Sequence, residues 1–88
     1  MQATLEISMY PLRSDYENQI LQFLEYLHLD KEIQIMVNAL STQVTGEFDH
    51  VFSTVQAAIK KVYESDVKAT FVIKVLKDSH DLNYAYNA

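Results

Sequence analysis

Hydrophobic and polar residues alternate along three stretches of the chain. The first runs from Ala3 to Met9, where every second residue is hydrophobic, and similar alternations occupy residues 32–38 and 69–76. A period of two is the pattern of a β-strand with one buried face. These stretches therefore predict three strands.

Two other stretches carry hydrophobic residues three and four positions apart, as on one face of an α-helix. The first begins at Ser14 and lasts to about His28, and Ser14 and Glu17 have the spacing of a capping box. The second is expected to begin with Asp49 as its N-cap. Its hydrophobic face comprises Val51, Phe52, Val55, Ala58, Ile59 and Val62.

A polar stretch, residues 38–49, separates two similar halves and holds the only glycine, Gly46. Within it, Thr42 to Thr45 predicts a short strand that returns beside the preceding one. Gly46 then marks either a bulge or the close approach of another group to the backbone. The resulting order, strand, helix, strand, strand, helix, strand, predicts a ferredoxin-like βαββαβ fold of the α+β class. Right-handed crossovers place both helices on one face of a four-stranded antiparallel sheet.

The opposite face of this sheet has no cover within the chain, and we expect a homo-oligomer, a homodimer or homotetramer, to form sheet to sheet. The domain is expected to span residues 1–77, and residues 78–88 to form a polar tail that is loose or depends on a partner. The open face is predicted to carry Thr4, Glu6, Ser8, Tyr10, Gln34, Met36, Asn38, Thr70, Val72, Lys74 and Leu76.

Composition narrows the function classes. The absence of cysteine excludes disulfides and thiolate metal sites, and a net charge of -5 opposes nucleic-acid phosphates and anionic lipids. The chain shows neither a signal-peptide pattern nor a hydrophobic run near the roughly 20 residues that span a bilayer. We expect a cytoplasmic protein with no nucleic-acid and no membrane partner.

Candidate catalytic groups are few. His28, His50 and His80 lack the spacing of metal ligands, so we interpret them as surface residues. Ser41 and Thr42 have no nearby base to activate them, although a base distant in sequence stays possible. Glu47 and Asp49 fit helix capping better than catalysis or ligand contact. An enzyme acting on a small heterocycle would need a general acid or base, and none stands out.

What remains is a binding site. Short hydroxyls and an amide, together with an aromatic ring and a carboxylate, suit a small, flat, partly cationic molecule. We therefore predict a binding protein with no catalytic residue, no metal site and no cofactor. The alternative is a structural or regulatory interaction module, in which the open sheet serves assembly and the polar centre only forms turns and caps.

Two motifs add a resemblance. Tyr10-Pro11-Leu12, and the segment Ser41-Thr42-Gln43-Val44-Thr45-Gly46-Glu47-Phe48-Asp49, resemble the YkoF-like family of small thiamine-binding proteins. The resemblance implies a ferredoxin-like fold, dimers and tetramers, and non-catalytic binding of thiamine or its hydroxymethylpyrimidine part. Arg13 departs from the pattern, because the family usually has a small residue after Leu12. The implied ligand-binding residues are Ser8, Tyr10, Asn38, Ser41, Thr42, Gly46 and Glu47.

Roles for some of these residues follow as hypotheses from the resemblance. Glu47 or Asn38 would accept a hydrogen bond from an aminopyrimidine, and Tyr10 or Phe48 would supply a flat apolar contact.

Overall fold

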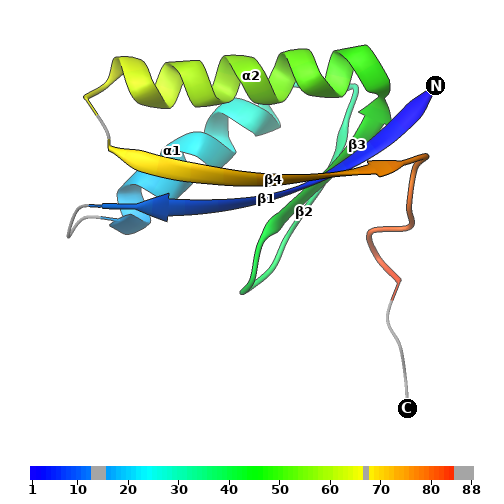
Figure 1. The fold of residues 1–88 in the computed structure, drawn as a ribbon, viewed down its shortest axis with the longest axis horizontal. Coiled ribbons are helices and arrows are strands. Elements are labelled where there is room, and N and C mark those ends of the chain that lie inside the picture. The colour runs from blue at the N-terminus through cyan, green and yellow to red at the C-terminus, as the bar shows by residue number, and fades with distance from the viewer. Residues whose placement is uncertain (13–15, 67, 85–88) are drawn as a thin grey trace.

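The computed structural model describes residues 1–12, 16–66 and 68–84. Its neighbouring strands are antiparallel in the order β2-β3-β1-β4, and both helices cover one face of the sheet (Figure 1). This confirms the predicted ferredoxin-like α+β fold. The elements are β1 (Gln2–Pro11), α1 (Tyr16–His28), β2 (Gln34–Val37), β3 (Thr42–Glu47), α2 (Phe48–Glu64) and β4 (Ala69–Lys77).

The core lies between the sheet and the two helices. Alternate residues of β1 point into it, and the helical stripes meet them from the other side, as the two periodicities require. Each large side chain that is fully buried contributes roughly 1.5–3 kcal/mol, and a slip of one residue in β1 would turn this set toward solvent. The buried hydrophobic residues are Ala3, Leu5, Ile7, Phe23, Leu27, Ile33, Val44, Val51, Val55, Ala58 and Val62.

The junction between β3 and α2 corrects one prediction. Glu47, not Asp49, is the N-cap of α2: its backbone is extended (φ -63°, ψ 138°), and its carboxylate accepts a hydrogen bond from His50 N at 2.8 Å. The strand runs directly into the helix, so the cap lies two residues earlier than expected. Asp49 sits in the first turn, where a carboxylate still complements the helix dipole. The capping box predicted at Ser14, and Arg13, lie outside the described residues.

Gly46 is not at a bulge. The β1–β3 register runs without interruption from Ile7 opposite Thr42 to Gln2 opposite Glu47. A Cβ at Gly46 would lie 3.0 Å from Val51 Cγ2 and 3.3 Å from Ile33 Cγ2. The other expectation for Gly46, that another group approaches its backbone closely, is therefore confirmed. The approaching groups are the core side chains of Val51 and Ile33.

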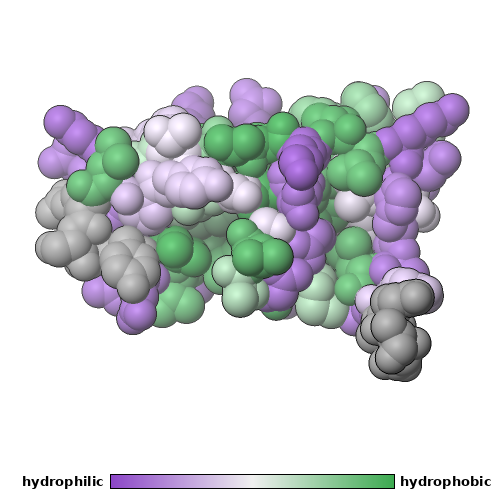
Figure 2. Space-filling model, turned by 60° about the horizontal axis from the view of Figure 1, so that its bottom comes forward, coloured by the Kyte–Doolittle hydropathy of each residue, from purple (hydrophilic) through white to green (hydrophobic). Residues whose placement is uncertain are grey.

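Strand β4 lies at one edge of the sheet, and its exposure departs from the predicted pattern. Val72 on the open face is 50% exposed, but Val75 on the helix face is also 52% exposed. The helices pack mainly on β1 and β3, so they leave most of β4 exposed. In Figure 2, hydrophobic residues on the displayed surface are interspersed with hydrophilic ones.

The chain turns back after β4 at Asp78, which has a positive φ of 69°. Asp78 N donates to Gln2 O at 3.0 Å, and its carbonyl lies 3.0 Å from the Thr4 hydroxyl, so the start of the tail is joined to β1. Residues 85–88 lie outside the described part. None of the helices in the described ranges is both long and apolar enough to cross a membrane.

Candidate functional site

A small cavity opens where the pairing between β1 and β3 ends. That ladder stops at Ile7 opposite Thr42, whereas β1 continues beside β4 as far as Pro11 opposite Ala69. The last part of β1 therefore faces the β2–β3 turn across a gap of about 180 Å³. Five of the seven residues predicted to bind ligand line this cavity: Ser8, Tyr10, Asn38, Ser41 and Thr42.

The inner wall of the cavity is hydrophobic. It is built from α1 and from the helix-facing side of β1: Ile7 and Phe23 belong to the core, and Met9 packs against it. The Phe23 ring is 1% exposed and packs against Phe71 with 4.9 Å between ring centroids. A flat ligand would therefore meet a firm apolar wall. The wall contains Ile7, Met9, Ile20 and Phe23.

Asn38 shapes the turn at the cavity rim. Its side-chain oxygen accepts hydrogen bonds from Leu40 N at 2.9 Å and Ser41 N at 3.1 Å, and its backbone N donates to Ser41 O at 3.2 Å. An amide oxygen has two lone pairs, and both are used here. The side-chain nitrogen donates to Gln43 Oε1 at 3.3 Å. Asn38 therefore holds the turn, and its oxygen has no spare acceptor for an aminopyrimidine.

Ser41 connects the rim to a carboxylate that the sequence did not single out. The Ser41 hydroxyl donates to Glu6 Oε2 at 3.0 Å, and it accepts from Gln43 Nε2 at 2.7 Å. Glu6 Oε1 also pairs with Lys74 Nζ at 3.3 Å. Glu6 stands opposite Gln43 in one ladder and Lys74 in the other. Only the register reveals this group, because its members are far apart in sequence.

Gly46 and Glu47 lie at the other end of β3 from the cavity. Glu47 follows Thr42 by five residues, which is about 16 Å along a strand. Glu47 caps α2 there, and the hydrogen bond from His50 N lowers its pKa below the ordinary value. Phe48 packs on the next turn of α2. The structure thus does not bring these three residues to the cavity.

The described lining of the cavity combines hydrogen-bonding groups with an apolar wall. Its described lining contains hydroxyls, an amide and backbone groups, but no histidine, lysine or carboxylate. The Glu6 carboxylate is linked to the cavity through its hydrogen bond with the Ser41 hydroxyl. Such a site can orient a small ring by hydrogen bonds and favours a ligand with amino groups.

Comparison with known protein families decides the classification. The model of the YKOF-related family matches residues 2–76. The chain belongs to this family. Comparison with curated proteins gives no match.

Solved structures share the fold of this YkoF-related chain. A Thermotoga maritima protein, named as a proposed thiamine biosynthesis/salvage protein, is 18% identical with a TM-score of 0.74, over 85% of this chain and 82% of its own. A Streptococcus pneumoniae protein is 20% identical with a TM-score of 0.77, over 93% and 90%. A domain of unknown function from Bacillus cereus is 18% identical with a TM-score of 0.74, over 94% and 85%. At these identities the likeness establishes the fold.

Proposed function

We propose that this protein binds thiamine through its hydroxymethylpyrimidine part, or that molecule alone, as a non-catalytic homo-oligomer without a cofactor. The observation that carries the proposal is the cavity beyond the β1–β3 ladder, which gathers five residues that the family resemblance implicates. Membership of the YkoF-related family and the name of the Thermotoga maritima protein support a thiamine-related ligand.

The size of the cavity favours the pyrimidine part. Its volume of about 180 Å³ is below the roughly 300–1,000 Å³ typical of pockets for drug-sized ligands. One ring fits such a space better than two joined rings. The second ring of thiamine would extend outward, toward the acidic Glu6 and solvent. A positive charge there is favoured by the net charge of -5.

Recognition would use the polar rim against the apolar wall. The ring would pack on the Phe23 side of the cavity, while the hydroxyls of Ser41 and Thr42 exchange hydrogen bonds with its amino and hydroxymethyl groups. The Ser41 hydroxyl donates its hydrogen to Glu6 and accepts one hydrogen bond from Gln43. Its second lone pair can therefore accept a hydrogen bond from an amino group of the ligand. The proposal of a non-catalytic role rests on a described lining that contains no histidine, lysine or carboxylate.

The homo-oligomer is supported by hydrophobic exposure on the open face of the sheet. Tyr10 is 55% exposed, and Val72 and Leu76 are exposed along β4. Tyr10 also lines the cavity. A second subunit packed on the open sheet would therefore cover the cavity rim as well as the apolar residues.

An interaction module is the second candidate, and one observation favours it. A groove of about 570 Å³ runs between α2 and β4, on the helix side, and is lined by Phe52, Ile59, Tyr63 and Ile73. This groove has no predicted ligand residue in its described lining. A protein that serves assembly alone would use such apolar surface and would ignore small ligands.

A thermal-shift titration with thiamine, thiamine phosphates and hydroxymethylpyrimidine separates the two candidates. A binder gains roughly 2.7 kcal/mol of stability at a ligand concentration one hundred times the Kd. Thr42→Val removes a hydroxyl at the cavity and should weaken this gain, whereas Glu47→Gln, at the far end of β3, should retain it. Saturable stabilisation that is equal in wild type and Thr42→Val would contradict the site, and no stabilisation of a folded protein by any of the ligands would favour the interaction module.

A further inference from the structure

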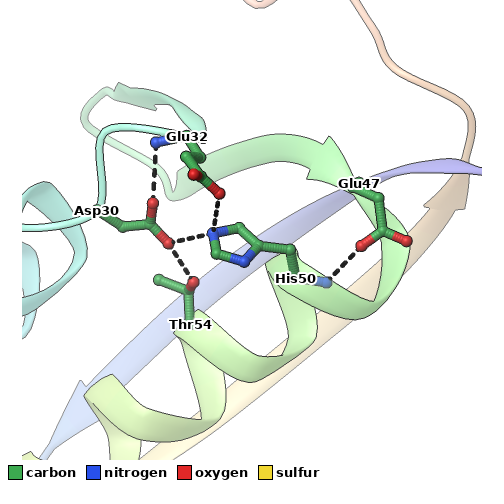
Figure 3. A network of polar contacts seen from close by, with 5 residues as sticks. All are labelled: Asp30, Glu32, Glu47, His50 and Thr54. Carbon is green, nitrogen blue, oxygen red and sulfur yellow. Dashed lines mark hydrogen bonds and ion pairs between the residues drawn. The ribbon is translucent and has the colours of Figure 1, made fainter.

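A second polar cluster lies at the start of α2 and is independent of the cavity. Asp30 and Glu32 are in the loop between α1 and β2, and His50 is in the first turns of α2 (Figure 3). His50 Nε2 lies 2.7 Å from Asp30 Oδ2 and 3.4 Å from Glu32 Oε2. One ligand atom from each of the three residues lies within 4.8 Å of the others.

The imidazole nitrogen is buried without a hydrogen bond. Among the described residues, His50 Nε2 is inaccessible to solvent and has no partner with hydrogen-bond geometry, although Asp30 Oδ2 is only 2.7 Å away. The carboxylate oxygen therefore lies off the direction in which the ring nitrogen would donate. A ring nitrogen that is closed off from solvent between two carboxylate oxygens, without hydrogen-bond geometry to either, calls for an explanation, and a bound cation is one of the few available.

The distances suit a metal ion of the zinc class. Such ions bind His nitrogen and carboxylate oxygen at about 2.0–2.2 Å in tetrahedral geometry, which sets the ligand atoms about 3.3–3.5 Å apart. The separation between His50 Nε2 and Glu32 Oε2 is already 3.4 Å. The separation to Asp30 Oδ2 would need to widen by about 0.6 Å, a movement within reach of a side chain on a loop.

Neighbouring groups already orient the Asp30 carboxylate. Its Oδ1 accepts from Glu32 N at 2.9 Å, and its Oδ2 accepts from the Thr54 hydroxyl. Thr54 lies four residues after His50, so both side chains project from one face of α2. The Thr54 hydrogen bond lowers the pKa of Asp30, while desolvation opposes this shift. Carboxylates that bind metals are commonly held by such outer hydrogen bonds.

We propose that Asp30, Glu32 and His50 bind a divalent transition-metal ion such as Zn²⁺, with water completing the coordination. The imidazole ligand favours zinc, cobalt or nickel over calcium and magnesium, which prefer oxygen alone. A bound ion would join the α1–β2 loop to the start of α2. Metal binding would thus stabilise the folded protein by mass action.

The test is calorimetric titration of chelator-treated, full-length protein with Zn²⁺, repeated with Co²⁺, whose visible absorption reports its coordination. We expect one saturable site per chain. His50→Gln should weaken Zn²⁺ affinity at least about tenfold, because even loss of an outer-shell partner typically costs 10–100-fold. His80→Gln is the matched control, since it removes a histidine of the tail that is outside the cluster, and it should bind as wild type does.

Glu32→Gln is the second variant, chosen because its side chain is 79% exposed and its loss should not affect folding. It should also weaken Zn²⁺ binding and alter the Co²⁺ spectrum. Three results would overturn the proposal: no saturable Zn²⁺ binding by the folded wild type, equal affinity in His50→Gln and His80→Gln, or binding of Mg²⁺ or Ca²⁺ as tight as Zn²⁺. The titration contains no thiamine-like ligand, so its outcome is separate from that of the proposed function.

Discussion

Replacing Gly46 by alanine tests how tightly β3 packs against α2. The added Cβ would lie 3.0 Å from Val51 Cγ2 and 3.3 Å from Ile33 Cγ2. Both neighbours are buried, Val51 on α2 and Ile33 at the end of the loop before β2, so neither can move freely. Overpacking of a core costs about 1–3 kcal/mol, and removing a glycine from a strand returns about 0.5–1 kcal/mol. We therefore expect a net destabilisation of about 1 kcal/mol.

In a domain of this size, about 1 kcal/mol corresponds to a decrease in Tm of about 4–8 °C. Urea unfolding of wild type, Gly46→Ala, Val51→Ala and the double variant gives a complete cycle. Val51→Ala removes the methyl group nearest the new Cβ, so in that background Gly46→Ala should be neutral or stabilising. The reasoning is refuted if Gly46→Ala costs the same in both backgrounds, or if it stabilises the otherwise unchanged protein.

Three further changes test the turn, the cap and a buried hydroxyl. Asn38→Ala should lower the free energy of unfolding by about 0.5–1.5 kcal/mol, because two backbone N–H donors lose their acceptor. Asn38→Asp keeps an acceptor oxygen and should retain most of the wild-type stability, which urea unfolding of both variants would measure. Glu47→Gln should lower Tm more than Asp49→Asn, since only Glu47 caps α2, and calorimetry of both variants would expose the opposite order. Thr45→Val deletes the buried hydroxyl that donates to Ala3 O and should cost about 0.5–1.5 kcal/mol in denaturant unfolding; an unchanged midpoint would contradict this hydrogen bond.

The order of elements was predictable because each predicted element has one period and one buried face. β1 shows this most clearly, since Ala3, Leu5 and Ile7 are all buried. β4 shows the limit: its alternation correctly predicted a strand, but Val75 stays exposed because the helices pack mainly on β1 and β3. Periodicity reports which residues share a face, and packing decides whether that face is covered.

The N-cap of α2 shows a different limit. Glu47 and Asp49 both precede the hydrophobic stripe, and either carboxylate can accept from a free backbone N–H. The deciding fact is that β3 extends to Glu47 and leaves no loop before the helix. The end of β3 is set by its pairing with β1, which reaches Gln2 opposite Glu47. Local sequence propensity does not contain this information.

The candidate site was foreseen in part. The segments around Ser8 and Ser41 meet because the antiparallel register places the end of β1 beside the β2–β3 turn. Glu47 belongs to the same sequence motif as Ser41, but an extended strand carries it to the opposite end of the sheet. His50 and Asp30 are twenty residues apart in sequence, so only the packing of α2 against the α1–β2 loop reveals their contact.

The most direct test of the proposed binding site is an NMR titration of ¹⁵N-labelled protein with hydroxymethylpyrimidine, in which the backbone amides are followed individually. The account predicts saturable shifts concentrated at residues 8–10 and 38–42, with little change at Gly46 and Glu47. Shifts centred on Gly46 and Glu47, or no saturable shifts in a folded protein, would contradict it.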